Sequence, residues 1–125
     1  MNKNEYLNKL KALNLDKNRY CIISGGVLLL YGLKETTSDI DLKIKPDYFQ
    51  ELKKRFNFKK SNKYSYLYEL NDMIEVAVLD FSKEDIKIVD DFPVESLELQ
   101  LNWMLKNSRA KDLEKIEIIK EYLNK

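Results

Sequence analysis

The sequence predicts an α+β fold in which a mixed β-sheet of about four to five strands is flanked by helices in two layers. Residues 38–44 alternate polar and apolar side chains, which is typical of a half-buried strand. Residues 64–70 and 73–79 are two β-rich runs, and the Asn-Asp pair between them favours a hairpin turn. Residues 110–123 carry apolar side chains at helical spacing. Together these patterns indicate a sheet with helices packed on it.

The first third of the chain alternates helix and strand. Residues 3–13 place apolar side chains at helical spacing, which predicts an amphipathic helix. Residues 20–23 form a short β-run that ends at the glycine pair 25–26. The apolar run 27–31 then predicts a buried helix, which stops near Gly32.

The later elements continue this order. A proline suits the first turn of a helix over 46–55. Residues 86–89 predict a short edge strand, and the Asp-Asp-Phe-Pro sequence at 90–93 is expected to break it. Two helices, over about 95–106 and 110–123, complete the chain.

Composition narrows the classes of function. The 125 residues suit one domain, expected to span 1–125, and the 44% of hydrophobic residues suffices for a core. The absence of histidine excludes histidine-based catalysis and most zinc sites. The single cysteine, Cys21, lies in an apolar run, which favours a buried structural thiol in a reducing compartment. Without a signal-peptide core or a membrane-length apolar run, we expect a soluble, cytoplasmic protein with no membrane partner.

Positive charge is concentrated in one segment although the net charge is only +1. Residues 43–63 hold eight Lys or Arg residues against Asp47 and Glu51. Such a segment is most simply a solvated surface. It can also flank a site for an anionic substrate, because clustered positive charge raises the local concentration of anions.

Three carboxylates are candidate site residues. Asp39 and Asp41, at positions i and i+2 of a strand, point to the same face roughly 6–7 Å apart and repel each other unless a cation lies between them. Glu75 lies in the apolar run 73–79, where burying a carboxylate is costly without a partner. An oxygen-only set favours a hard ion such as Mg²⁺. The alternative is a half-exposed strand, or a Glu75 paired with a lysine such as Lys43.

Ser24, Gly25 and Gly26 form a second candidate site. Backbone N–H groups that open a helix, together with the helix dipole, favour phosphate. Two glycines let a phosphate chain approach without a Cβ in the way, and Ser24 adds a hydroxyl. Taken alone, paired glycines at a strand–helix junction are most often only a turn.

The two patches together resemble the signature of the nucleotidyltransferase (polymerase β-like) superfamily: a Gly-Gly pair, then twelve residues, then Asp-Ile-Asp-Leu at 39–42. Glu75 falls where that superfamily places its third carboxylate. The sequences Gly-Gly-Val-Leu-Leu-Leu-Tyr-Gly (25–32) and Thr-Thr-Ser-Asp-Ile-Asp-Leu (36–42) are similar to minimal nucleotidyltransferases, in the branch of abortive-infection toxins and antibiotic-modifying transferases. Ser-Arg-Ala-Lys-Asp-Leu (108–113) resembles a late Arg-Xaa-Lys-Asp motif of that branch.

The resemblance implies the nucleotidyltransferase fold and a metal-dependent transfer of a nucleoside monophosphate from a nucleoside triphosphate such as ATP to a hydroxyl, with release of pyrophosphate. It implies two Mg²⁺ ions, or Mn²⁺, held by Asp39, Asp41 and Glu75, with Glu75 also accepting the hydroxyl proton. Arg109 and Lys111 are implied to neutralise phosphate charge beside the glycine turn. The acceptor stays open between a small molecule, an RNA end and a protein, and a homodimer is also open.

Two positions depart from that pattern. Glu35 stands where relatives often carry Arg, and Gln100 stands where they often carry Lys, so both positions remove positive charge from the triphosphate side. The alternative function is therefore a degenerate, non-catalytic module of the same fold that binds a nucleotide or a partner protein, for example in a toxin–antitoxin or regulatory pair. The complete set of three carboxylates favours the enzyme, because a degenerate copy would tend to lose it.

Aromatic side chains offer a last candidate feature. Tyr64, Tyr66 and Tyr68 are expected on one face of the strand over 64–70. A base-stacking platform is one interpretation, but packing against a helix is favoured. Trp103 is interpreted in the same way, as a core residue or an interface anchor.

Overall fold

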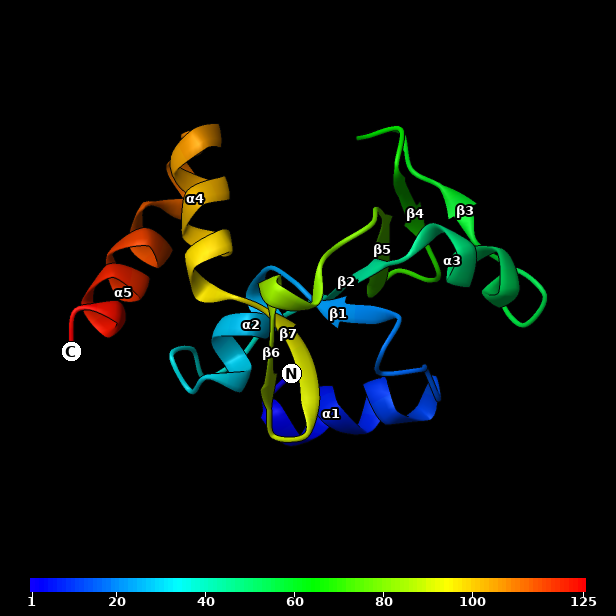
Figure 1. Cartoon of the computed structure of the whole chain (residues 1–125), viewed down its shortest axis with the longest axis horizontal. Coiled ribbons are helices and arrows are strands. Elements are labelled where there is room, and N and C mark those ends of the chain that lie inside the picture. Colours follow the sequence, from blue (N-terminus) through cyan, green and yellow to red (C-terminus); the bar gives the residue numbers. More distant parts are fainter.

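The computed structural model describes residues 1–125. Its strands form one sheet, and the helices pack around it (Figure 1). The helices are α1 (Lys3–Ala12), α2 (Gly25–Leu30), α3 (Pro46–Leu52), α4 (Leu97–Asn107) and α5 (Leu113–Leu123), with short 3₁₀ turns at Lys83–Asp85 and Ala110–Asp112. The strands are β1 (Tyr20–Ile22), β2 (Ile40–Ile44), β3 (Lys59–Lys60), β4 (Leu67–Glu69), β5 (Ile74–Val78), β6 (Ile86–Val89) and β7 (Phe92–Glu95). The predicted α+β class is confirmed.

The sheet has seven strands in the order β3-β4-β5-β2-β1-β7-β6, and is therefore wider than the sequence suggests. β2 lies at its centre, parallel to β5 and antiparallel to β1. β7 pairs with the other side of β1 in the parallel sense. The predicted hairpin is confirmed, because β4 and β5 are antiparallel. Its turn is held by the Asn71 side chain, which accepts the N–H groups of Met73 and Ile74 at 2.8 and 2.9 Å.

The strand over 86–89 ends before the Asp-Asp-Phe-Pro sequence, as expected, but Phe92 and Pro93 already belong to the next strand, β7, which the sequence analysis did not predict. Asp90 and Asp91 have φ angles of 51° and 71°, and this left-handed pair forms a two-residue hairpin in which Val89 faces Phe92. Such hairpins need positive φ at both central residues, and Asp tolerates this conformation better than most side chains. The sequence therefore turns at the two aspartates and continues as β7.

Because β7 continues through Glu95, α4 begins later than residue 95. Ser96 is its N-cap, and the Ser96 hydroxyl accepts the N–H of Leu99 at 3.2 Å. The last predicted helix, over 110–123, also begins later than expected. Ala110–Asp112 form a 3₁₀ turn, and α5 begins at Leu113. Both helices exist as predicted, with their first turns moved by the preceding element.

The strand predicted over 64–70 is shorter in the structure. Only β4 pairs, and residues 61–66 turn back to β3, which the sequence analysis did not predict. The backbone N–H of Ser61 donates to the carbonyl of Leu67 at 3.0 Å across this turn. A strand as short as β3 has no periodicity for sequence analysis to detect.

The core lies under one face of the sheet. β2 buries Ile40, Leu42 and Ile44 and directs Asp41 and Lys43 to the other face, as the alternation predicts. Buried side chains from α1, α2 and α3 join them in one cluster of 22 residues. Complete burial of a large apolar side chain stabilises the fold by about 1.5–3 kcal/mol. The opposite face of β2 and β5 is left for polar side chains.

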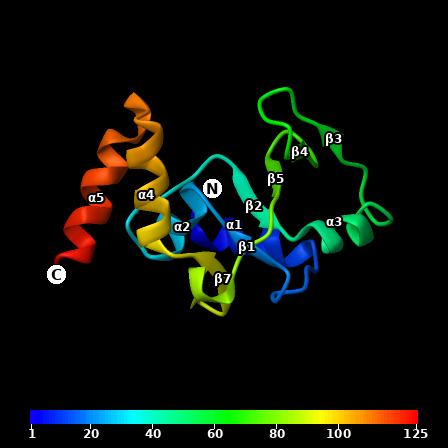
Figure 2. The same cartoon turned by 45° about the horizontal axis from the view of Figure 1, so that its top comes forward.

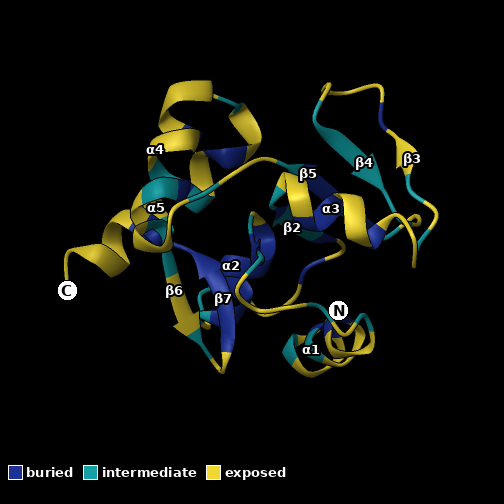
Figure 3. Cartoon of the chain, turned by 45° about the vertical axis from the view of Figure 1, so that its right-hand side comes forward, coloured by how far each residue is buried: buried dark blue, intermediate teal, exposed yellow.

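The remaining elements lie at two ends of the molecule. α4 and α5 pack side by side at one end, and α3 with the β3–β4 hairpin lies at the other (Figures 1 and 2). Colouring by burial shows α2 and the adjoining strands as the most buried elements (Figure 3). None of the helices combines the length and the apolar character that crossing a membrane would require.

Candidate functional site

A cavity of about 710 Å³ lies over the polar face of β2 and β5. Its walls come from segments far apart in sequence: the β1–α2 junction, the loop before β2, the turn over 61–66, and the facing parts of α4 and α5. The sequence-predicted residues that line it are Ser24, Gly25, Asp39, Asp41, Glu75, Arg109 and Lys111. Gly26 is the one predicted site residue outside the lining.

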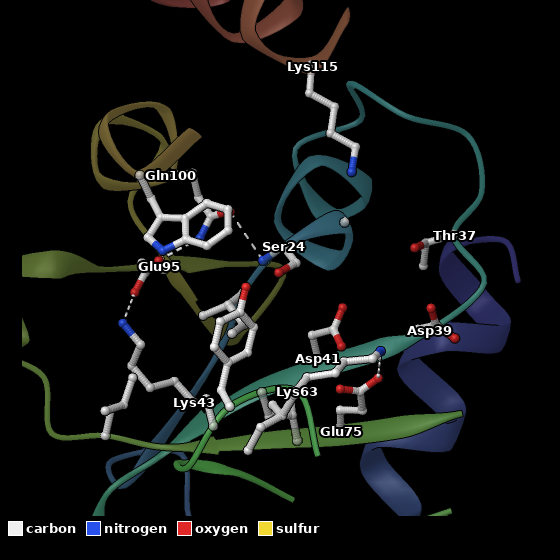
Figure 4. A pocket seen from close by; sticks show the side chains of 18 of the residues that line it. Ser24, Thr37, Asp39, Asp41, Lys43, Lys63, Glu75, Glu95, Gln100 and Lys115 are labelled. Atoms are coloured by element: carbon white, nitrogen blue, oxygen red, sulfur yellow. Dashed lines mark hydrogen bonds and ion pairs between the residues drawn. The ribbon is translucent and has the colours of Figure 1, made fainter. Parts of the chain in front are cut away.

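The three carboxylates form one wall of the cavity, which we call the carboxylate wall (Figure 4). Asp41 and Glu75 are register partners on the adjacent parallel strands β2 and β5, so sheet geometry places their side chains next to each other. Asp39 immediately precedes β2. Burial raises the pKa of the Asp41 carboxyl from 3.8 to about 6, and repulsion by Glu75 and then by Asp39 adds to this effect.

A lysine approaches this wall, but it is not the one that the sequence analysis named. Lys63, from the turn before β4, places its Nζ 3.5 Å from Oε1 of Glu75 (Figure 4). Lys43 instead forms an ion pair with Glu95. Lys63 is largely exposed, so its pair with Glu75 contributes little to stability.

The carboxylate wall fits a hard divalent cation in its chemistry. Its donors are carboxylate oxygens only, which suit Mg²⁺ or Mn²⁺. Burial is the main reason for the raised pKa of Asp41, and the repulsion from Glu75 and Asp39 that adds to it is a charge that a cation would offset. No group of three carboxylates is close enough, as placed, to hold an ion. The residue types therefore fit, and the side chains would have to converge around the cation.

Gly25 and Gly26 lack space for a Cβ for different structural reasons. A Cβ on Gly25 would lie 2.7 Å from Oγ1 of Thr37, and Gly25 lines the cavity. A Cβ on Gly26 would lie 2.6 Å from Cγ2 of Ile22 and even closer to the hydroxyl of Tyr6. Gly26 is therefore required by packing against the core, and Gly25 borders the space into which a ligand could enter.

Ser24 has an unusual backbone that a buried hydrogen-bond relay holds in place. Its φ of 58° and ψ of −137° lie in a region that non-glycine residues rarely adopt. The N–H of Ser24 donates to Oε1 of Gln100 at 3.2 Å, and Nε2 of Gln100 donates to Oε1 of Glu95 at 2.5 Å. Glu95 in turn pairs with Lys43 (Figure 4). Gln100 thus forms a structural link between Glu95 and the glycine turn.

The positive side of the cavity is richer than the sequence suggests. Six cationic side chains line it, of which Lys43 is paired with Glu95. The other five, which we call the cationic rim, are Lys34, Lys63, Arg109, Lys111 and Lys115. Sequence analysis named only Arg109 and Lys111. The signals for the others are weak: Lys34 directly precedes the acidic Glu35, and Lys115 follows Lys111 by one helical turn.

Members of the cationic rim differ in the contacts that they already make with other side chains of the protein. Nε of Arg109 donates to Oδ2 of Asp112 at 2.6 Å, and the guanidinium lies 4.5 Å from the centre of the Trp103 ring. Burial lowers the pKa of Lys115, and the nearby Lys34 ammonium lowers it further. The rim therefore holds like charges close together, an arrangement that an anion would stabilise.

The comparisons with known proteins bear on the fold. No protein-family model matches the sequence, and no curated protein matches it. Among solved structures, a candidate nucleotidyltransferase from Thermotoga maritima superposes with a TM-score of 0.67 and 21% identity, covering 99% of this chain and 96% of that one. The aminoglycoside nucleotidyltransferase ANT(2″)-Ia, solved with adenylyl-2″-tobramycin, gives a TM-score of 0.67 and 14% identity, over 95% and 88% of the two chains. The chain therefore has the fold of the nucleotidyltransferase superfamily.

Proposed function

We propose that this chain is an enzyme that transfers a nucleoside monophosphate from a nucleoside triphosphate to a hydroxyl acceptor. The observation that carries this proposal is that one cavity joins the carboxylate wall, the Ser24–Gly25 turn and the cationic rim. The fold is that of ANT(2″)-Ia, whose structure holds an adenylylated sugar, and this supports the same class of reaction here.

The carboxylate wall would hold the metal. Asp39, Asp41 and Glu75 supply the ligands for Mg²⁺, as two ions by the resemblance to the superfamily, or for Mn²⁺. When bound, the ions would neutralise phosphate charge and make the acceptor hydroxyl more acidic. Binding them would also relieve the repulsion from Glu75 and Asp39, which adds to the effect of burial on the pKa of Asp41.

The chain's own side chains would orient the reactants. The acceptor oxygen forms a bond to the α-phosphorus while the bond from the α-phosphorus to the bridging oxygen of the β-phosphate breaks. Glu75 accepts the hydroxyl proton, and pyrophosphate leaves with the electron pair of the broken bond. Lys34, Lys111 and Lys115 would bind the departing phosphates beside Gly25, because they line the same cavity and carry the charge that pyrophosphate needs.

The proposal is tested by label transfer and by ligand binding. We expect α-³²P-labelled ATP, GTP, CTP or UTP to label a component of RNA, protein or small-molecule fractions in the presence of Mg²⁺, and EDTA to prevent it. Asp41→Asn should reduce transfer at least roughly 10³-fold, since it removes charge stabilisation worth several kcal/mol. Asp72→Asn, an exposed carboxylate in the β4–β5 turn, is the matched control and should leave transfer unchanged. Equal transfer by the wild type and Asp41→Asn would refute the proposal.

A second candidate is a nucleotide-binding module without turnover. The observation that favours it is the Lys63–Glu75 ion pair, since an ammonium group already neutralises part of the carboxylate wall. This candidate predicts that nucleoside triphosphates raise Tm equally with and without Mg²⁺. A thermal shift that requires both the nucleotide and Mg²⁺ would favour the enzyme instead.

A further inference from the structure

The three tyrosines that the sequence places on one strand face are separated by the structure. Tyr68, on β4, packs on Phe49 of α3 with a ring-centre distance of 4.7 Å, which is the helix packing that the sequence analysis favours. Tyr64 and Tyr66 lie before β4, in the turn, and stack on each other at 5.3 Å with an angle of 14° between their rings. Both line the cavity. The other interpretation of this motif, a base-stacking platform, therefore concerns only these two residues.

The tyrosine pair is attached to the carboxylate wall. The carbonyl of Tyr66 accepts the N–H of Val78 at 2.8 Å, so the turn is joined to β5, the strand that carries Glu75. Within the turn, the N–H of Leu67 donates to the carbonyl of Tyr64 at 3.2 Å. Yet Tyr64 is 49% exposed, although an aromatic ring of this size gains most from being covered. The pair is thus a fixed aromatic surface beside the candidate catalytic residues, with one ring open to a ligand.

The charge of the same turn indicates what kind of ring it would receive. Residues 59–66 hold Lys59, Lys60 and Lys63 and no acidic residue. A planar aromatic surface beside clustered lysines matches a nucleotide, whose base stacks on aromatic rings and whose phosphates attract ammonium groups. A neutral sugar ring could also contact tyrosine, but it carries no negative charge to pair with Lys59 and Lys60, which form no ion pair within the protein, unlike Lys63.

We propose that Tyr64 and Tyr66 form a stacking subsite for a nucleobase of the reacting nucleotides. The base can come from two sources that share this chemistry: the nucleoside triphosphate, or the end of a single-stranded RNA that supplies the acceptor hydroxyl. This inference rests on the proposed function for the identity of its ligand. Its test measures binding in EDTA, so it stands or falls without any turnover.

The test compares ligands that carry and lack bases. Fluorescence anisotropy is measured in EDTA with a 5′-fluorescein-labelled eight-nucleotide oligo(A) RNA and with an abasic strand of the same length. ATP and inorganic tripolyphosphate are then used as competitors. If the base comes from RNA, oligo(A) binds more tightly than the abasic strand; if it comes from the triphosphate, ATP competes better than tripolyphosphate.

Two double variants of the tyrosine pair test the stacking: leucine removes both rings, and phenylalanine keeps them. A Tyr64→Leu, Tyr66→Leu double variant should lose roughly 5-fold to 150-fold of the base-dependent affinity, the range measured for stacking on one aromatic side chain. The double variant to Phe keeps both rings and should bind as the wild type does. Tyr122→Leu, at a partly exposed tyrosine on α5, is the matched control.

The outcomes separate the two proposals. Equal binding of base-containing and abasic ligands by the wild type would overturn the subsite, as would no binding of either, or an equal loss in Tyr122→Leu. Competition by maltotriose that equals that of ATP would show a sugar surface instead and would also overturn it. Label transfer that depends on Asp41 could still be observed in each of these cases, and the subsite could be intact in a chain that transfers nothing.

Discussion

The carboxylate wall and the cationic rim line the same cavity but are positioned by different means. Asp41 and Glu75 lie on paired strands, where backbone hydrogen bonds fix one residue opposite the other. The cations come from two loops and from the end of the chain, and long flexible side chains carry their charges. The acids are therefore placed by the sheet, whereas the cations are placed by how distant segments pack. In both groups, like charges repel each other, and a metal ion with a triphosphate would supply the opposite charges.

The sharpest difference is expected in the pH dependence of the metal-free protein. The folded state raises the pKa of Asp41 from 3.8 to about 6, so it binds a proton that the unfolded chain has released. The free energy of unfolding therefore falls as pH rises from 4 to 6, by up to about 3 kcal/mol, and this cost persists above pH 6.

Asp41→Asn removes that cost. We expect the Tm of the variant minus that of the wild type to increase between pH 4 and pH 7, both measured in EDTA. Mg²⁺ should stabilise the wild type more at pH 8 than at pH 5, since protons compete for the same oxygens. If this difference in Tm does not change with pH, the folded state does not raise the pKa of Asp41.

The glycine turn tests where packing ends and the site begins. Gly26→Ala should lower the free energy of unfolding by about 1–3 kcal/mol, because its Cβ would overlap Ile22 and Tyr6 in the core. Gly25→Ala should cost less stability, since Thr37 is a side-chain neighbour that can shift, but it should weaken triphosphate binding. Urea unfolding and nucleotide titration of both variants measure the two effects. Similar losses of stability in both would contradict this division.

The cationic rim is expected to contribute to binding rather than to folding. Lys115→Gln should weaken triphosphate binding roughly tenfold, the equivalent of one charge-assisted hydrogen bond. Burial and Lys34 lower the pKa of Lys115, whereas the buried Asp112, whose Oδ1 lies 4.0 Å from the Lys115 Nζ, opposes this effect. Because Arg109 also donates to Asp112, loss of Lys115 should change the free energy of unfolding by less than about 1 kcal/mol. Lys120→Gln, exposed on the same helix, is the control for isothermal titration. A large loss of stability in Lys115→Gln would assign the lysine a structural role instead.

The relay from Gln100 to Ser24 predicts the smallest effect, a coupling of about 1 kcal/mol between two positions. Gln100→Ala frees the Ser24 N–H from the acceptor that holds its unusual backbone. Ser24→Gly adopts the same φ without strain, so it should recover part of the triphosphate affinity that Gln100→Ala loses. A double-mutant cycle on KM and kcat measures this. Strict additivity would show that Gln100 does not position the turn.

Sequence analysis located the parts of the molecule that follow a local period. The alternation in β2 predicted the buried face and the opposite direction of Asp41, with Asp39 immediately before the strand, and the hairpin that ends in β5 contains Glu75. Periodicity succeeds here because the side chains of a strand have only two directions. The role of each carboxylate as a metal ligand stays a prediction.

Features that depend on packing between distant segments were not visible in the sequence. Lys63, Lys34 and Lys115 look like ordinary surface lysines, since nothing local shows which loop or helix will border the cavity. The left-handed Asp90–Asp91 turn was not predicted, because two aspartates shortly before a proline are equally typical of a loop that ends a strand. The sequence predicted Gln100 only as a position without positive charge, because its hydrogen bonds to Ser24 and Glu95 depend on the packing of α4 against the sheet.

Tyr6 gives the N-terminal helix a part in the site. Its hydroxyl is completely buried and unpartnered against Gly26, and burial, followed by the charge of Asp41, raises its pKa. Through Tyr6, α1 therefore packs directly against the glycine turn at Gly26. A truncation or fusion that displaces α1 would act as a mutation of the candidate active site, although the helix contributes no residue to the cavity lining.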